Sequence, residues 1–271
     1  MGIVDKIAQA GIIGMGGAGF PTNKKLGGRI EYYIVNGAEC EPLLRTDRYL
    51  MIHKAAEIVG AIQALGSELQ VEHCVIALKK HYTEEIKSLK KAIEEAGAAI
   101  EIHEMESFYP AGDEQTMVHE VTGRVVPPAG IPIAVGCVVD NIGTVYAISE
   151  ALKGLPLTHR YLTLTGEVTH PVVLRVPIGT SYQFCFKQAG GTLSRDYFVV
   201  NGGPMMGHAV APDQVEKAVV TKTTSGILVL PADGYHAGVY ETDLKRMLNR
   251  AKSACIQCRF CTDLCPRHLL G

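Results

Sequence analysis

Four cysteines near the end of the chain are the residues whose chemistry is most specific. From Cys255 to Pro266 the chain reads C-x2-C-x2-C-x3-C-P. This spacing is typical of [4Fe-4S] ligands, and the two-residue gaps let the backbone turn around one face of the cube. Zinc is an alternative, but a zinc site usually takes its four ligands as two spaced pairs. The predicted metal ligands are Cys255, Cys258, Cys261 and Cys265.

The fourth cysteine of the run, Cys265, can ligate either the same cluster as the other three or a second cluster. In two-cluster proteins this cysteine ligates the other cluster, which requires a second cysteine run. The printed sequence ends six residues after Cys265. Either one cluster takes all four cysteines, or the chain is the first part of a longer protein, and we favour the longer protein.

The other four cysteines fit ordinary roles. Three lie in apolar, strand-like runs and are expected to be small core residues: Cys74, Cys137 and Cys185. Cys40 stands between Glu39 and Glu41, and two neighbouring carboxylates would raise the pKa of its thiol. We therefore expect no reactive thiolate among them.

A glycine-rich stretch, GIIGMGGAGFPT over residues 11–22, is the second chemical signal. Gly14, Gly16 and Gly19 satisfy G-x-G-x-x-G, which in a dinucleotide site follows a strand. Residues 3–9 instead space their apolar side chains as a helix does. The loop therefore either holds another anionic or planar ligand or is a turn without a ligand.

Strands and helices are expected to alternate through the first half of the chain. The predicted strands cover residues 31–39, 72–79, 98–105 and 137–141. The predicted helices cover residues 46–66, 84–97 with Thr83 as the cap, and 143–154. This order predicts βαβ units and a mainly parallel sheet.

The pattern changes after residue 154. Short β-like runs recur at intervals of roughly ten residues from 158 to about 207, which indicates a small β-rich domain. The methionines of GGPMMG (202–207) are expected to fill space in a core turn. One more strand lies within 221–231, and an amphipathic helix over 241–255 leads to the cysteines. The predicted domains are 1–154, 155–235 and 236–271.

Composition excludes several classes of partner. The 271 residues carry 26 Lys and Arg against 28 Asp and Glu, a net charge of −2, so neither nucleic acid nor an anionic membrane surface is an expected partner. No apolar run approaches the roughly 18 residues of a membrane span, and the N-terminus lacks the pattern of a secretory signal. We expect a cytoplasmic protein with no transmembrane segment.

Four motifs in order carry a family resemblance: GMGGAGFPTNKK, NGAECEPLLRTDR, YPAGDEQTM and VVDNIGT. They resemble the flavin-binding subunits that include the NADH-oxidising flavoprotein of respiratory complex I, the RnfC electron-transport subunit and the cobalamin reductases of bacterial microcompartments. VPIGTSYQF and VVNGGPMMGHAV extend the similarity, so it covers the whole chain. The resemblance implies an α/β fold: a Rossmann-like FMN-binding domain, a small β-grasp domain of the soluble-ligand-binding type, and the start of a helical iron-sulfur domain.

The resemblance also implies cofactors and site residues. FMN and a [4Fe-4S] cluster are the expected cofactors, with NADH as the substrate. Expected FMN contacts are Gly14, Gly16, Gly17, Lys25, Asn36, Gly112, Asp113, Asn141 and Thr144, of which the last two lie near the phosphate. Lys25 would neutralise the phosphate or bond to the ring system, and Phe20 would stack on the adenine of NADH. Glu41, near the nicotinamide, and Glu114, beside the flavin ring, are the candidate catalytic residues.

Two features of the sequence weaken the assignment of the family's site residues to this chain. Complex I flavoproteins carry an aspartate where this sequence has Ala38, so one flavin contact is missing or replaced. Taken singly, four of the carboxylates could equally be solvated loop charges: Glu39, Glu41, Asp113 and Glu114.

The leading functional hypothesis is electron transfer from NADH through FMN to the iron-sulfur cluster. The preferred type is a cobalamin reductase inside a microcompartment. The glycine-rich loop begins within 14 residues of the first residue, whereas many RnfC proteins have a longer N-terminal extension, and GAECEPLLRTDRYLM is closest to the cobalamin reductase type. Its partners would be a corrinoid or an adenosyltransferase, together with the shell or a second copy of the chain. One alternative is an RnfC-like subunit of a membrane-associated ferredoxin:NAD oxidoreductase, with a ferredoxin-type acceptor. An alternative of another class is a non-enzymatic β-grasp binding module.

Overall fold

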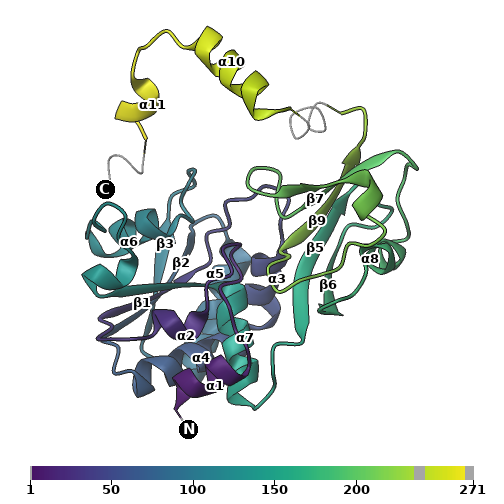
Figure 1. Ribbon diagram of the computed structural model, residues 1–271. Helices are drawn as coiled ribbons and strands as arrows, with labels where there is room; N and C mark the ends of the chain where they lie inside the picture. Colours follow the sequence, from purple (N-terminus) through teal and green to yellow (C-terminus); the bar gives the residue numbers. More distant parts are fainter. Residues whose placement is uncertain (1, 235–241, 266–271) are drawn as a thin grey trace.

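The computed structural model describes residues 2–234 and 242–265. Two sheets with separate hydrophobic cores form two domains side by side, and a short helical tail stands apart from both (Figure 1). All elements of the first sheet precede residue 153, and the second sheet begins at His159. The domain boundaries expected from the sequence at residues 154 and 235 stay predictions.

The first sheet has four parallel strands in the order β3-β2-β1-β4. They are β1 (Tyr32–Asn36), β2 (His73–Lys79), β3 (Ile100–Met105) and β4 (Cys137–Asn141), at the positions expected from the sequence. The chain moves outward from β1 through β2 to β3 and then returns to the other side of β1. The strand order therefore reverses between β1 and β4, and ligands of open α/β sheets bind beyond the carboxyl ends of the strands at such a point.

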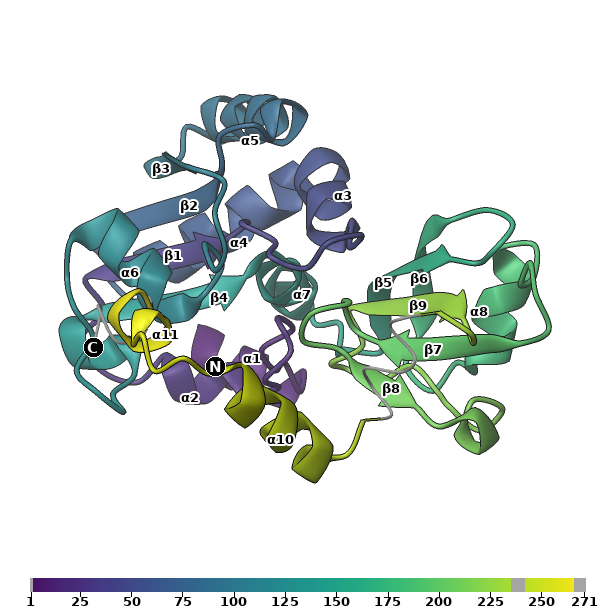
Figure 2. The ribbon, with the colours of Figure 1, turned by 90° about the horizontal axis from the view of Figure 1, so that it is seen from above.

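Helices cover both faces of this sheet (Figure 2). One face packs against the larger core, built with α1 (Ile3–Gln9), α3 (Thr46–His53), α4 (Ala55–Glu68), α5 (Thr83–Ala96) and α7 (Ile142–Leu152). The opposite face packs against α6 (Glu114–Thr122). The one-turn helix α2 (Thr22–Lys25) follows the glycine-rich loop, and the 3-10 turn η1 (Pro132–Val135) precedes β4.

Three local expectations are wrong. The single helix expected over 46–66 is two helices, because Lys54 leaves the helical conformation (φ −132°) and lets α3 pack against α5 and α7 in a direction of its own. Gly66 does not end α4; a Cβ there would lie 2.7 Å from Cys74 Sγ, so the glycine allows α4 to approach β2. Thr83 is the first residue of α5, whose N-cap is Tyr82.

The second sheet has five strands in the order β6-β5-β9-β7-β8. They are β5 (His159–Gly166), β6 (Val172–Pro177), β7 (Tyr197–Asn201), β8 (His208–Val210) and β9 (Gly226–Pro231). β5 and β9 are parallel, and the other pairs are antiparallel. Helix α8 (Tyr182–Gln188), which the sequence pattern did not indicate, packs on one face, and the short turn η2 (Pro212–Gln214) follows β8. A mixed sheet with one packed helix agrees with the expected β-grasp domain.

Contacts between the domains are numerous and polar. The hydroxyl of Thr163 on β5 accepts the Arg45 N–H at 2.9 Å and lies 2.8 Å from the hydroxyl of Thr46. Tyr161 on the same strand contacts Tyr49 and Tyr146 through ring centroids 5.9 and 5.5 Å apart. The segment that leads into α3 is therefore fixed by both domains.

Candidate functional site

Two asparagines mark the point where the strand order reverses. Asn36 ends β1, Asn141 ends β4, and the two are register partners in the parallel pair. Asn141 also caps α7, because its Oδ1 accepts the Gly143 N–H at 2.8 Å. Both predicted flavin contacts therefore lie at the carboxyl edge of the sheet, where the fold itself favours a ligand.

The glycine-rich loop lies against this edge. It closes on itself through two backbone bonds, Gly14 N–H to the Phe20 carbonyl at 2.7 Å and Gly19 N–H to the Gly14 carbonyl at 3.2 Å. A Cβ on Gly16 would be 3.5 Å from the Asn141 side chain. Gly17 has φ +120° and is exposed, and in the described part of the chain no atom would lie within 4 Å of a Cβ placed on it. At Gly17 the main chain therefore borders open space, which suits close approach of a planar or anionic ligand.

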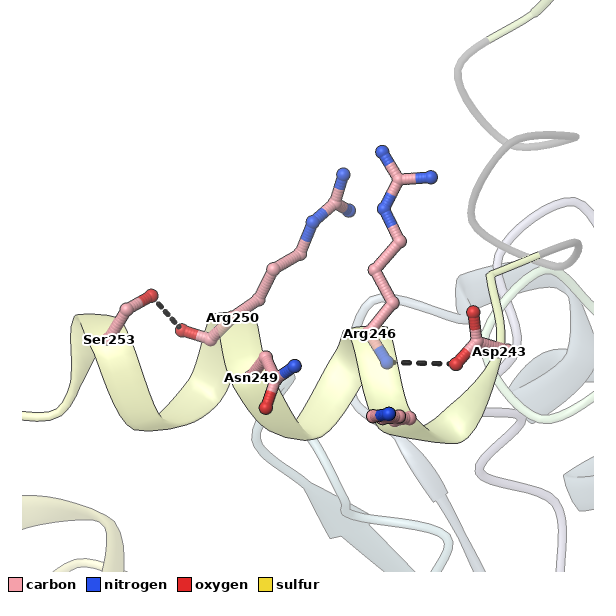
Figure 3. A pocket seen from close by; sticks show the side chains of 6 residues that line it. Asp243, Arg246, Asn249, Arg250 and Ser253 are labelled. Atoms are coloured by element: carbon pink, nitrogen blue, oxygen red, sulfur yellow. Dashed lines mark hydrogen bonds between the residues drawn. The ribbon is translucent and has the colours of Figure 1, made fainter.

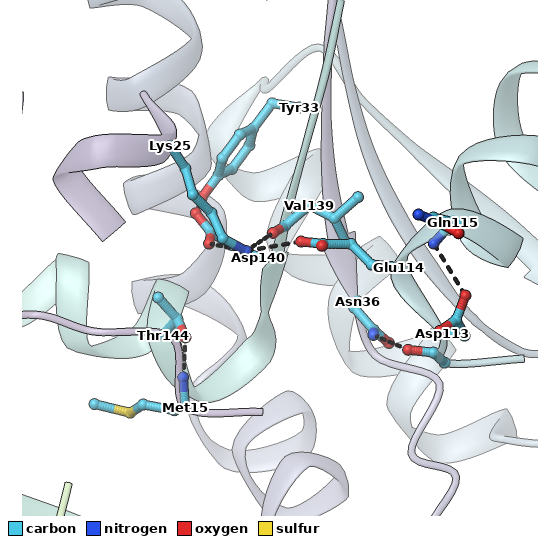
Figure 4. A network of polar contacts seen from close by, with 11 residues as sticks. Met15, Lys25, Tyr33, Asn36, Asp113, Glu114, Gln115, Val139, Asp140 and Thr144 are labelled. Atoms are coloured by element: carbon cyan, nitrogen blue, oxygen red, sulfur yellow. Dashed lines mark hydrogen bonds and ion pairs between the residues drawn. The ribbon is translucent and has the colours of Figure 1, made fainter. Parts of the chain in front are cut away.

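Both backbone polar groups of Met15, at the start of the loop, are hydrogen-bonded. Its N–H donates to Thr144 Oγ1 at 2.9 Å, as Figure 4 shows. Its carbonyl accepts from Arg160 Nη2, also at 2.9 Å. Thr144 is a predicted site residue, whereas Arg160 on β5 belongs to the second domain and no sequence motif indicated it.

Lys25 is held by three groups at the same edge (Figure 4). Its Nζ lies 2.8 Å from Glu114 Oε1, 2.9 Å from the Val139 carbonyl oxygen and 3.8 Å from Asp140 Oδ1. The structure thus brings together two predicted site residues from α2 and α6. The ammonium group of Lys25 is therefore held at the edge of the crevice, paired with one carboxylate and close to a second.

Asp140 is a buried carboxylate that sequence reasoning missed. Its side chain is fully inaccessible, and Oδ2 accepts the Tyr33 hydroxyl at 3.0 Å. Burial raises the pKa of Asp140 to about 6, although Lys25 and the Tyr33 hydrogen bond act in the opposite direction. Among residues 2–234 and 242–265, Asp140 Oδ1 has no hydrogen-bond partner, and neither has the buried Thr22 Oγ1. The available signal was an acidic residue in the apolar run CVVDN.

Asn36 and Gly112 hold two loops together. Asn36 Nδ2 donates to the Gly112 carbonyl at 2.9 Å, and the Gly112 N–H lies 2.9 Å from Cys40 Sγ. A Cβ on Gly112 would overlap the Ala38 carbonyl oxygen, so this glycine is required by packing between protein segments. Asp113 caps α6 by accepting the N–H groups of Gln115 and Thr116.

The thiols outside the cysteine run behave largely as expected. Burial raises the pKa of Cys40, and Glu39 adds to that effect, so the direction was right although burial is the larger cause. Cys137 and Cys185 are core residues, whereas Cys74 is half-buried.

A buried carboxylate, Asp47, is hydrogen-bonded to Asn141, and the half-buried Glu39 interacts electrostatically with Asp47. Asn141 Nδ2 donates to Asp47 Oδ2 at 2.6 Å. Burial raises the pKa of Asp47 and, together with the charge of Asp47, raises the pKa of Glu39 to about 7. Arg160 is the cation that balances this pair, and burial lowers its pKa to about 10. Glu39 is therefore not the simple solvated loop charge that its sequence context allowed.

Glu41 is bound by the second domain. Its carboxylate accepts the Met205 N–H at 2.9 Å and the Met206 N–H at 2.6 Å, and a Cβ on Gly203 would overlap it. The side chains of Met205 and Met206 are 50% and 72% exposed, so the expectation that they fill a core turn is wrong. The GGPMMG turn instead presents its backbone donors to the loop that follows β1.

Phe20 and the predicted cluster ligands have few neighbours. Phe20 is 47% exposed at the end of the glycine-rich loop, free to take a stacking partner. Three of the run's cysteines are exposed and Cys265 is half-buried. Within residues 2–234 and 242–265 no three metal-ligating side chains converge on one point. The donor set has the chemistry of an iron-sulfur site, but the described residues do not assemble it.

Helix α10 (Leu244–Ala254) leads into the cysteine run, and α11 (Phe260–Asp263) lies within it. Asp243 caps α10 by accepting the Arg246 N–H at 2.9 Å, and Figure 3 shows Arg246 and Arg250 projecting from the same side of the helix. Neither helix has a buried residue. This part of the chain does not contribute to the crevice of the first domain.

The fold and site define a two-domain α/β protein with a glycine-rich loop and a fixed lysine at the strand-order reversal of a parallel sheet. The sequence profile of the Nuo51 FMN-binding domain matches residues 7–150, and that of the SLBB domain matches residues 161–209. The chain belongs to the family of this FMN-binding domain, as its motifs predicted.

Several known proteins are similar to the chain. The cobalamin reductase PduS of Citrobacter freundii is 41% identical over 272 residues, covering 99% of this chain and 58% of PduS. A component of the proton-translocating ferredoxin:NAD(+) oxidoreductase complex of Clostridium ljungdahlii is 35% identical over 269 residues, covering 97% of this chain and 55% of that component. The chain therefore spans little more than half the length of these relatives.

A solved structure shows the same fold. An NAD+-reducing [NiFe]-hydrogenase in the H2-reduced state matches with a TM-score of 0.73 at 21% identity, covering 86% of this chain and 47% of that one. None of the helices in residues 2–234 and 242–265 combines the length and apolar character that a membrane span requires.

The buried carboxyl of Asp140 makes stability depend on pH. Because its pKa is raised from 3.8 to about 6 on folding, the folded state holds this proton more tightly than the unfolded chain, and the contribution of Asp140 to stability falls between about pH 4 and pH 6. Asp140→Asn keeps an acceptor for Tyr33 without the charge. We expect this variant to gain about 3 kcal/mol relative to the native protein over that interval, measured by urea unfolding at several pH values.

Tyr33→Phe provides the companion measurement. Removing the hydroxyl that stabilises the carboxylate should raise the pKa of Asp140 further. The pH interval over which its contribution to stability falls should then extend above pH 6. A stability difference between Asp140→Asn and the native protein that stays constant from pH 4 to 8 contradicts the assignment.

Proposed function

We propose that the first domain binds FMN in the crevice beyond β1 and β4 and uses it to take electrons from NADH. The observation that carries this proposal is the glycine-rich loop of an FMN-binding family lying at the strand-order reversal, with Gly17 bordering open space. Gly14 and Gly16 would complete the cradle. Two buried oxygens near Lys25, Asp140 Oδ1 and Thr22 Oγ1, have no hydrogen-bond partner among the described residues, which supports the fit because a polar ligand or its water can satisfy such atoms.

The charged and polar groups of the crevice have distinct proposed roles. Lys25 would bond the phosphate or the ring system of the flavin, and its contacts with Glu114 and Val139 fix the ammonium group in advance. Asn141 and Thr144 would lie near the phosphate at the start of α7, where backbone N–H groups and the helix dipole favour an anion. Asn36, Gly112 and Asp113 would border the ring.

NADH would approach from the exposed side of the loop. Phe20 is accessible for stacking on its adenine, and Glu114 and Glu41 remain the candidate catalytic residues. The amide bonds from Met205 and Met206 hold the Glu41 carboxylate in one orientation. Bound FMN supplies the conversion of a two-electron hydride into single electrons.

The cysteine run would supply the exit for single electrons. Cys255, Cys258, Cys261 and Cys265 have the spacing and the thiol chemistry of [4Fe-4S] ligands. Their assembly into a site would involve chain beyond that described, in keeping with the greater length of the relatives.

We propose cobalamin reduction as the reaction of the whole protein, with cobalamin as electron acceptor. The higher identity to cobalamin reductase PduS, 41% against 35% for the relative from the ferredoxin:NAD(+) oxidoreductase complex, supports this choice. The partner would then be a corrinoid or an adenosyltransferase, and the location a microcompartment in the cytoplasm. The second candidate is an RnfC-like subunit that exchanges electrons between NADH and ferredoxin, and the 35% identity of that relative over 97% of this chain supports it.

Gly17 tests flavin binding directly. Gly17→Val fills the open space with a side chain and should abolish FMN retention, measured by fluorescence titration and by flavin released on denaturation. Gly179→Val is the matched control, because Gly179 also has a positive φ of +93° and open space around a Cβ but lies in the second domain. If native protein retains no flavin, or both variants retain it equally, the proposed site is wrong.

The acceptor is tested with the longer protein that contains this chain. NADH should reduce cob(III)alamin and cob(II)alamin, followed by absorbance under anaerobic conditions, and the Gly17→Val variant should lose at least 90% of the rate. A protein that reduces ferredoxin with NADH and leaves cobalamin unchanged supports the second candidate instead.

The cysteine run is tested by metal analysis of the same longer protein. Cys258→Ser should lower bound iron and acid-labile sulfide by one cluster and leave the FMN content unchanged, because the run lies apart from the crevice. Cys74→Ala is the control, as Cys74 lies half-buried on β2. Unchanged iron in Cys258→Ser, or zinc as the bound metal, contradicts the assignment.

A further inference from the structure

Arg160 is a buried cation of the second domain with no role in the motifs described above. It lies on β5, is 3% exposed, and donates through Nε to the Thr224 carbonyl and through Nη2 to the Met15 carbonyl, both at 2.9 Å. One guanidinium therefore joins a turn of the β-grasp domain to the glycine-rich loop of the other domain.

The turn that Arg160 binds contacts the same loop at two more points. Lys222 Nζ donates to the Gly11 carbonyl at 2.6 Å, at the beginning of the loop. At its end, a Cβ on Gly19 would lie 3.1 Å from the Thr223 methyl group. Arg160 bonds the loop between these points, at Met15. Residues 11–19 are thus held along their length by the second domain.

The charge of Arg160 is balanced within the protein. Asp47 and Glu39 are the acidic groups that act on it, and Asp47 is in turn bonded to Asn141 at 2.6 Å. The guanidinium is buried, and both of its hydrogen bonds to described residues go to backbone carbonyl groups. Its contribution is geometric: five donors in a rigid plane can fix two carbonyl groups at once.

We infer that Arg160 is a positioning residue through which the β-grasp domain sets the shape of the glycine-rich loop and hence of the flavin site. The inference deepens the proposed function and rests on it for the identity of the ligand. The N–H and the carbonyl of Met15 belong to two successive peptide groups: Thr144 holds the first, and Arg160 holds the second, which joins Met15 to Gly16. Without Arg160, the Met15 carbonyl loses this hydrogen bond, and the backbone conformation of Gly16 and Gly17 is less restricted.

Three variants test the inference in flavin-free and FMN-loaded protein. Arg160→Met removes both donors, Arg160→Lys keeps a cation that can serve one carbonyl, and Arg175→Met is the control on the neighbouring strand, where the side chain is exposed. We expect Arg160→Met to raise the Kd for FMN at least tenfold, Arg160→Lys to restore part of the affinity, and Arg175→Met to match the native protein.

Hydrogen exchange of the flavin-free protein separates loop geometry from flavin chemistry. In Arg160→Met the amides of residues 14–19 should exchange at least tenfold faster, while those of α5 keep their native rate. Unchanged loop exchange overturns the positioning role, and faster exchange with an unchanged Kd for FMN overturns its link to the flavin site. Native protein that binds no FMN overturns the proposed function, whereas the exchange result still decides the role of Arg160 in the loop.

A double variant covers the case in which Arg160→Met does not fold, since that substitution leaves the buried Asp47 without its cation. Arg160→Met combined with Asp47→Asn removes both charges and keeps an amide oxygen for Asn141. The double variant should fold and show the same faster exchange over residues 14–19 relative to Asp47→Asn alone. Equal exchange in these two proteins overturns the inference.

Discussion

The parallel register between β1 and β4 is the constraint on which the site depends. It places Asn36 opposite Asn141 at the carboxyl edge, with the strand order reversing between them. The loops that leave β1 and β4 therefore diverge and open a crevice, which in α/β sheets is where ligands bind. The glycine-rich loop and Lys25 also reach this crevice, so residues far apart in the sequence converge at the ends of β1 and β4.

Burial of charge at this edge makes the two domains interdependent. Asp47 lies in the first domain and Arg160 in the second; both are buried, and the charge of each favours the charged form of the other. Glu41 is half-buried, and its carboxylate accepts two backbone N–H groups from the GGPMMG turn of the second domain. Separating the domains would change the surroundings of these charged groups and remove the contacts that hold them in place. The shape of the crevice therefore depends on both domains.

Local patterns predicted the elements well, and tertiary requirements account for what they missed. Alternation and turn residues placed all four parallel strands, because those signals are local. The motifs predicted that Lys25, Glu114, Asn36 and Asn141 belong to one flavin site, and the structure has them at one edge of the sheet. The break at Lys54, the packing role of Gly66 and the buried pair of Tyr33 with Asp140 depend on which segments become neighbours. Arg160 is the extreme case, since its partner Met15 is 145 residues away.

The position of Arg160 also bears on why a β-grasp domain accompanies this flavin fold. A module that only recruited a partner would need a free face and a flexible attachment. Here the 221–224 turn and β5 instead contact residues 11–19 and the segment that leads into α3. Glycines give that loop freedom to approach a ligand but leave it without side chains to hold its own shape. The second domain supplies the missing contacts from outside, so a loop made flexible by its sequence has a defined conformation in the fold.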